Sequence, residues 1–275
     1  MSLSVFVIVM AAAAMHAGWN ALIKGASDTL VLAVAICIAA SAMAALSLPF
    51  VPQPAPESWP FIGLSVALQT VYYLLVAAAY DRADMSLAYP VMRGAAPMIV
   101  AVVSASLLAE HLTPMAWAGV ALISGGILSL AALARSRRGL GFAALNALVI
   151  AAYTLSDGHG VRQSGAAVGY TLWIFLLTAP PVVAVSALRR GPGLVAACVA
   201  EWRRATLGGI GTMLSYGAAL WAMTTAPVAM VAALRETSIL FATLISVLIL
   251  HETVGRARWV AVGLVALGAG ALRLG

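Results

Sequence analysis

Residues 97–119 read PMIVAVVSASLLAEHLTPMAWAG, and this stretch decides the fold because a related stretch occurs later in the chain. Residues 236–263 read ETSILFATLISVLILHETVGRARWVAVG, and the landmarks of the two stretches match at one fixed offset. The spacing from an arginine to the following glutamate is also identical in the two copies. The matching pairs are Arg93 with Arg235, Glu110 with Glu252, Trp117 with Trp259, and Gly126 with Gly268. We therefore predict two related halves, residues 1–134 and 140–275, joined by a basic connection at residues 135–139.

The composition places both halves in a lipid bilayer. Apolar residues make up 63% of the chain, charged residues only 9%, and the mean hydropathy is +1.04. Soluble proteins carry about 25% charged residues. The net charge of +6 comes from basic residues between apolar blocks, where lipid headgroups and the rule of membrane insertion explain them better than a nucleic acid does. We expect a bilayer as partner and no nucleic acid.

Apolar runs of about 20 residues, the length of a transmembrane helix, can be counted ten times. The predicted spans cover residues 4–24, 30–50, 59–80, 85–108, 114–134, 140–158, 166–188, 205–225, 228–250 and 257–273. A segment rich in proline, residues 48–60, separates the second span from the third and cannot lie in the hydrocarbon. The sequence therefore predicts an all-α membrane protein.

The basic residues orient this bundle. Eleven lie in the odd-numbered connections: Lys24, Arg82, Arg135, Arg137, Arg138, Arg189, Arg190, Arg203, Arg204, Arg256 and Arg258. Only Arg162 and Arg273 lie on the other side. Basic loops stay in the cytoplasm, so the odd-numbered connections are predicted to be cytoplasmic. Five helices per half is an odd number, and the halves must therefore form two inverted five-helix repeats. Such repeats can exchange shapes around a central site, which is the geometry of alternating access in transporters.

The ten short helices and the two quoted stretches resemble the EamA branch of the drug/metabolite transporter superfamily, and the resemblance covers nearly the whole chain. The Trp, Tyr, His and Arg content of the spans is most similar to that of the YddG-type exporters of aromatic amino acids. The resemblance implies export across a bacterial inner membrane. The chain departs from the repeat pattern where Ile239 has no proline to match Pro97, so the bends of the second half do not follow from the first.

Polar residues within the spans are costly in hydrocarbon and usually face protein or a water-filled cavity. We expect the following to line one substrate-binding cavity: His16, Trp19, Asn20, Tyr72, Tyr73, Tyr89, Met92, Arg93, Tyr153, Asp157, Tyr216, Arg235 and Glu236. Aromatic rings would hold the apolar part of a solute, and the charged groups its zwitterionic end.

Several of these residues have a structural alternative. Arg93 and Arg235 lie deep in their spans and could hold the repeats together instead of recognising an anionic group. Asp157 lies near the predicted end of its span and could belong to a wetted rim. Glu110 and Glu252 are expected to be structural, capping the following helix or pairing with loop cations.

The leading hypothesis is an exporter of small amphipathic metabolites, aromatic or apolar amino acids above all. One alternative is an exporter of lipophilic cations such as methyl viologen, although the first span lacks the membrane glutamate of the small multidrug exporters. Another is a structural membrane protein that transports nothing. No zinc-ligand pair, Gly-flanked serine or phosphate-binding loop points to an enzyme, and nothing indicates a cofactor or metal. One chain already supplies two halves, so we expect a monomer.

Overall fold

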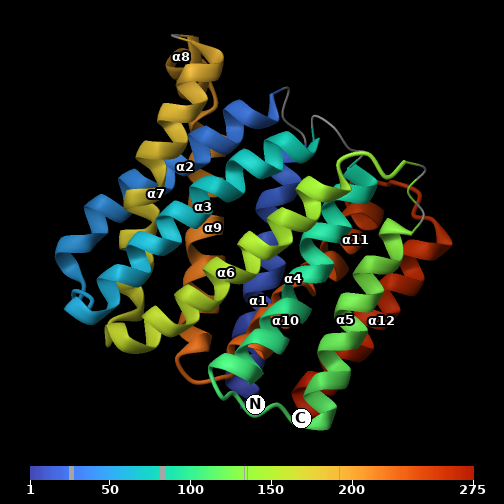
Figure 1. The fold of residues 1–275 in the computed structure, drawn as a ribbon. Coiled ribbons are helices and arrows are strands. Elements are labelled where there is room, and N and C mark those ends of the chain that lie inside the picture. The colour runs from blue at the N-terminus through green and yellow to red at the C-terminus, as the bar shows by residue number, and fades with distance from the viewer. Residues whose placement is uncertain (25–27, 81–84, 133, 135, 192) are drawn as a thin grey trace.

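The computed structural model describes residues 1–275 except 25–27, 81–84, 133, 135 and 192. Within this part all regular secondary structure is helical, and no strand occurs (Figure 1). The α-helices are α1 (Leu3–Lys24), α2 (Thr29–Ser47), α3 (Trp59–Tyr80), α4 (Met85–Leu107), α5 (Pro114–Ala131), α6 (Leu140–Ser164), α7 (Ala167–Arg190), α8 (Gly193–Ala200), α9 (Trp202–Met223), α10 (Val228–Arg235), α11 (Ser238–Leu248) and α12 (Arg256–Leu274). Two short 3₁₀ turns, Leu48–Phe50 and Pro56–Ser58, lie in the proline-rich segment between α2 and α3.

Nine segments in the described part of the chain are long and apolar enough to cross a membrane. The predicted eighth span corresponds to α9, which is not among the nine. Its glycines and polar residues lower its mean hydropathy, and Arg203 and Arg204 occupy its first turn. The protein is thus an all-helical, multi-pass membrane protein, whereas its ten-span inverted-repeat arrangement remains a prediction.

The predicted ninth span is not one helix. It is divided into α10 and α11 by a turn at Glu236 and Thr237. The Thr237 hydroxyl donates to the carbonyl of Leu234 at 2.6 Å, and its own backbone N–H bonds the same carbonyl at 3.0 Å, which closes the end of α10. By contrast, α4 stays helical through Pro90 and Pro97. The break therefore occurs in the span that has no internal proline, residues 228–250.

The sixth span is longer than predicted. The sequence places its end at residue 158, but α6 continues to Ser164. Asp157 therefore lies within the helix and is fully buried, so the interpretation of this residue as part of a wetted rim is wrong. The helix continues because Gly158 and Gly160 allow close packing, against Val228 and against Tyr170 respectively.

Helices α5 and α12 pack against each other through small residues that match across the repeat. A Cβ atom on Gly119 would lie 2.9 Å from the carbonyl oxygen of Gly268, and one on Gly268 would lie 2.7 Å from that of Gly119. A Cβ on Gly126 would lie 3.2 Å from the carbonyl oxygen of Ala261. Because 119 meets 268 while 126 meets 261, the helices run antiparallel, and equivalent positions of the two halves exchange roles.

The close approach of α5 and α12 leaves no room for a larger side chain at Gly268. Replacing Gly268 with leucine forces the side chain into the backbone of α5, and overpacking of this kind costs about 1–3 kcal/mol or more. Gly270, on the same helix, has nothing within 4 Å of its Cβ position, so Gly270→Leu should leave the stability unchanged or slightly raised. Thermal unfolding in detergent measures both variants. Equal unfolding temperatures would contradict the tight α5–α12 contact.

The connections after α4 and after α11 share one local geometry. Ala109 and His251 are the non-glycine residues with a positive φ in the described chain, each at 51°, and each directly precedes the glutamate of its repeat. In the first turn the backbone N–H of Glu110 bonds the carbonyl of Ser104 at 3.2 Å. In the second, the N–H of Glu252 bonds the carbonyl of Ser246 at 2.8 Å. The offset seen in the sequence is thus also an offset between matching turns.

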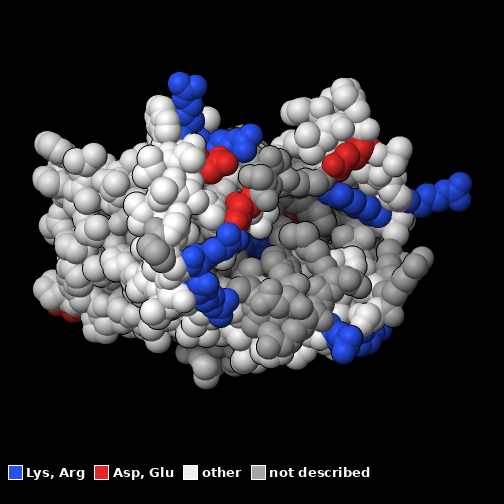
Figure 2. Space-filling model, turned by 90° about the horizontal axis from the view of Figure 1, so that it is seen from above, with Lys and Arg blue, Asp and Glu red and all other residues white. Residues whose placement is uncertain are grey.

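The helix ends separate into two faces. The last turns of α1, α3, α5 and α11, together with α8, lie at the upper end of Figure 1, and both chain termini lie at the lower end. Figure 2 looks onto the upper end, where Lys and Arg side chains outnumber Asp and Glu. We call this the basic face. The other is the opposite face, where Arg273 donates to the carbonyl of Met1 at 3.1 Å.

Asp28 fixes two helices at the basic face. Its carboxylate caps α2 by accepting from the backbone N–H groups of Leu30 and Val31, both at 3.1 Å, and it lies 2.5 Å from Nη2 of Arg190 at the end of α7. The Val31 N–H, foremost, and the Arg190 guanidinium hold the pKa of Asp28 below its usual range. The capped end of α2 is therefore anchored to α7 at neutral pH.

Candidate functional site

A pocket lies where α10 ends, between the first and second halves of the chain. Its walls come from α4, α6 and the α10 end, and its cavity volume of about 10 Å³ gives room for about one water molecule, so the pocket is closed to a larger solute in this conformation. The lining residues are Arg93, Ala96, Pro97, Val100, Ile150, Tyr153, Thr154, Ala232, Arg235 and Glu236. Four of the predicted site residues, Arg93, Tyr153, Arg235 and Glu236, are thus brought together.

An ion pair crosses this pocket. Nε of Arg93 lies 2.9 Å from Oε2 of Glu236, and the two side chains are only 11% and 8% exposed. The Nε–H is not aligned for a hydrogen bond, and Nη2 of Arg93 has no hydrogen-bond partner among the described residues. A guanidinium carries five N–H donors, and leaving buried donors unused is costly. Arg93 therefore has donors left for an anionic group in the pocket.

A second chain of contacts begins at Arg235. Its guanidinium carbon lies 4.9 Å from the centre of the Tyr216 ring, a cation–π contact. The Tyr216 hydroxyl donates to one carboxylate oxygen of Asp157, and the hydroxyl of Tyr170 donates to the other at 3.2 Å. These bonds connect α6, α7, α9 and the pocket.

Further aromatic side chains surround Arg93. The rings of Tyr72 and Tyr153 lie 6.1 Å apart edge to face. The charge of Arg93 acts on Tyr72, on Tyr89 and on the half-buried ring of His16. Of these rings, that of Tyr153 lines the pocket itself, where an apolar group would lie against it with the charged groups within reach.

Four predicted residues lie elsewhere. Tyr73 is 37% exposed and lines a separate groove between α2, α3 and α7. Trp19 packs against α9 at Gly211 and meets the ring of His16 at 5.2 Å. The Asn20 amide donates to the carbonyl of His16 at 2.7 Å, within its own helix. Met92 is buried, and its sulfur accepts from Asn146 at 3.0 Å.

Three further residues of this region were not predicted from the sequence. Thr154 lines the pocket, Tyr170 holds Asp157, and Asn146 is fully buried with an amide oxygen that lacks a partner in the described part of the chain. Asn146, Tyr153 and Asp157 follow each other at intervals of seven and four residues, which is one face of a helix. That spacing could have identified Asn146. Thr154 and Tyr170 carry no such signal.

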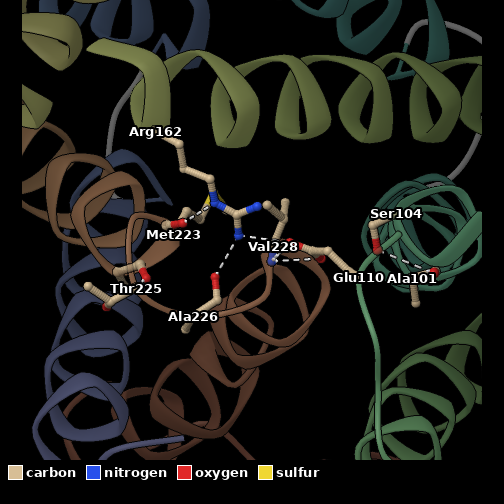
Figure 3. Close-up of polar contacts among 9 residues, drawn as sticks. Ala101, Ser104, Glu110, Arg162, Met223, Thr225, Ala226 and Val228 are labelled. Atoms are coloured by element: carbon tan, nitrogen blue, oxygen red, sulfur yellow. Dashed lines mark hydrogen bonds and ion pairs between the residues drawn. The ribbon is translucent and has the colours of Figure 1, made fainter. Parts of the chain in front are cut away.

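A polar network ties three connections at the opposite face (Figure 3). Arg162, at the end of α6, donates from Nε to the carbonyl of Met223 at 2.7 Å and from Nη2 to that of Ala226 at 2.9 Å. Nη2 also lies 2.7 Å from Oε1 of Glu110. The Glu110 carboxylate accepts from the first N–H of α10, at Val228, at 3.1 Å. We call Glu110, Arg162 and residues 223–228 the latch.

The expectation that Glu110 has a structural role, as a helix cap or as the partner of a cation, can be compared with its contacts in the latch. This residue does pair with a cation, but the helix that it caps is α10 and not the following helix, α5. Thr113 caps α5, since its hydroxyl accepts from the N–H of Ala116 at 3.1 Å. Glu110 is thus free to hold the N-terminus of the helix whose other end forms the pocket. A carboxylate is favourable at a helix N-terminus.

Comparison with known proteins identifies relatives of this fold. The model of the EamA-like transporter family matches the chain twice, at residues 3–132 and at residues 137–273. A crystal structure of another protein has a TM-score of 0.71 and 19% sequence identity, and the match covers 98% of this chain and 95% of that one. At this identity the likeness concerns the fold. No curated protein matches the chain.

Proposed function

Because the chain belongs to the EamA-like transporter family, we propose that it exports small amphipathic metabolites, aromatic and apolar amino acids above all, across a bacterial inner membrane. The observation that carries the substrate class is the buried Arg93 guanidinium, which keeps unused donors in a pocket lined by Tyr153 and apolar residues. In this proposal a solute carboxylate bonds Arg93 and its side chain lies against the tyrosine rings.

The charge of the pocket disfavours the cation alternative. Arg93 and Arg235 supply two positive charges against the one negative charge of Glu236, and all three residues line the pocket. A lipophilic cation would meet net repulsion there, whereas a carboxylate would meet attraction. We therefore keep methyl viologen as a competing substrate for the test and not as the proposed one.

We further propose that the two halves are inverted repeats that move by alternating access within one monomer. The reciprocal contact between α5 and α12, the matching turns at Ala109 and His251, and the two family matches support the repeat. The latch would close the pathway at the opposite face, which would be the outside if the basic face is cytoplasmic. Release of the latch would free the N-terminus of α10 and with it the pocket wall.

The experiment is counterflow in liposomes that hold the purified protein. Liposomes preloaded with unlabelled solute receive labelled phenylalanine, tryptophan or threonine, with methyl viologen as a fourth solute. The proposal predicts saturable uptake of tryptophan and phenylalanine in excess of threonine. Uptake of methyl viologen alone would replace it with a cation exporter. No uptake of any solute, from protein that remains folded, would favour a structural membrane protein.

A further inference from the structure

Three carboxylates lie in the buried part of the described bundle, and one of them differs from the others. Glu110 is paired with Arg162 and Glu236 with Arg93. Asp157 is fully buried, yet no cation lies within ion-pair distance among the described residues. Its hydrogen-bond partners are hydroxyl groups, from Tyr170 and Tyr216.

The partners of Asp157 suit two protonation states. An ionised carboxylate without a counter-ion is expensive inside a membrane. A hydroxyl group can donate to an ionised carboxylate and can equally accept from a protonated one, which a lysine or arginine cannot do. The site therefore accepts the loss or gain of a proton with a rotation of hydroxyl hydrogens.

The charged and titratable groups around Asp157 come from every helix packed against α6. Tyr170 of α7 and Tyr216 of α9 bond the carboxylate, and the Ser65 hydroxyl of α3 also faces it. Arg235 of α10 acts on Asp157 from behind the Tyr216 ring, and Tyr153 lies one turn away on α6. Two further groups point elsewhere: Arg93 of α4 faces Glu236, and Glu57, in the Pro56–Ser58 turn, is exposed.

A continuous set of contacts joins Asp157 to the solute pocket. The Tyr216 hydroxyl bonds Asp157, and the face of the same ring carries the guanidinium of Arg235, which lines the pocket. A change in the bond between Asp157 and Tyr216 would therefore shift the Tyr216 ring, and with it the guanidinium of Arg235 that packs on this ring. The link is a physical one between a proton site and a solute site.

We propose that Asp157 carries the proton that drives export: it binds a proton from the outside, releases it to the cytoplasm, and one proton enters for each solute that leaves. This inference rests on the proposed function, and it names the coupling ion and its binding residue. The only bond that forms and breaks in this step is the O–H bond of the Asp157 carboxyl group, and no electron is transferred. Asp157 in this role is a coupling residue and not a ligand of the solute.

The test separates coupled transport from exchange. Counterflow moves one solute for another and needs no net proton movement, whereas accumulation against a gradient needs the proton. In liposomes with an imposed pH gradient, the native protein should accumulate tryptophan several-fold above equilibrium. Asp157→Asn should lose this accumulation but retain saturable counterflow, with a shifted half-saturating concentration because its bond to Tyr216, which supports Arg235, has changed. Asp28→Asn, a control at the basic face, should keep both.

The other possible outcomes would overturn the role of Asp157, proton coupling, or the proposed function itself. If Asp157→Asn accumulates tryptophan as the native protein does, Asp157 is not the coupling residue. If the folded variant loses counterflow as well, its role is binding or structural. Native protein that shows counterflow but ignores the pH gradient would refute proton coupling alone, whereas absence of counterflow would refute the proposed function too.

A measurement on the native protein covers the case in which the variant does not fold. Tryptophan added to the native protein in unbuffered, mildly acidic detergent solution, with a pH indicator, should release a proton on binding, because Asp157 holds its proton there before tryptophan binds. Tryptophan binding without any proton uptake or release would overturn the inference.

Discussion

Replacement of Arg93 with methionine should lower tryptophan counterflow at limiting concentration by about 10- to 100-fold. The guanidinium lies in the pocket with unused donors, and a hydrogen bond to a charged group contributes about 1.5–3 kcal/mol. The expected change is a higher half-saturating concentration, measured by counterflow over a range of tryptophan concentrations in liposomes.

A loss of this kind has a structural explanation that must be separated from the proposed one. Arg93→Met leaves Glu236 buried without its cation, and a single buried charge of this kind is strongly destabilising. The double variant Arg93→Met with Glu236→Gln removes both charges and relieves this cost. If Arg93 binds the solute, the double variant should fold as well as the native chain and still bind tryptophan weakly. Recovery of native counterflow in the double variant would show that Arg93 serves only to balance Glu236.

Removal of the latch cation should open the opposite face. Arg162→Gln loses the ion pair to Glu110 and weakens the bonds to two carbonyls at the α9–α10 turn, so the closed state should lose about 1–2 kcal/mol. The open population then rises about tenfold. A cysteine introduced by Thr154→Cys in the pocket, with Cys37 and Cys198 changed to alanine, reports this opening through its rate of labelling by an impermeant thiol reagent.

The control for the latch lies on the same face. Arg273 donates to a single carbonyl, that of Met1, and takes no part in the latch. Arg273→Gln removes the same charge and should leave the labelling rate from outside the cell unchanged. Equal labelling in Arg162→Gln and in Arg273→Gln would mean that the latch does not close the pathway.

Several parts of this site follow from the sequence because they depend on local pattern. The depth of Arg93 and Arg235 in apolar runs requires a partner or a cavity, and the structure provides both at one pocket. Tyr153 and Asp157 lie one helical turn apart on the same helix, so they could be placed on a common face. The fixed offset between the two copies likewise anticipates the matching turns at Ala109 and His251.

Other parts depend on contacts between distant segments, which no local pattern contains. The latch joins Glu110 to Arg162 and to Val228, over 52 and 118 residues of sequence. The break at Glu236 has no proline or glycine to mark it, because a threonine hydroxyl closes the helix instead. Tyr73 is adjacent to Tyr72, but the rotation of the helix between neighbouring residues turns it toward α2 and α7.

The central claim is that solute binds in the pocket between α4, α6 and α10, and protection of Thr154→Cys tests it most directly. The rate at which the thiol reagent labels this variant is measured with and without tryptophan, in a protein in which Cys37 and Cys198 are changed to alanine. The account predicts that tryptophan slows labelling, with half-protection at the concentration that half-saturates counterflow. Labelling that is unchanged at tryptophan concentrations that saturate counterflow would contradict it.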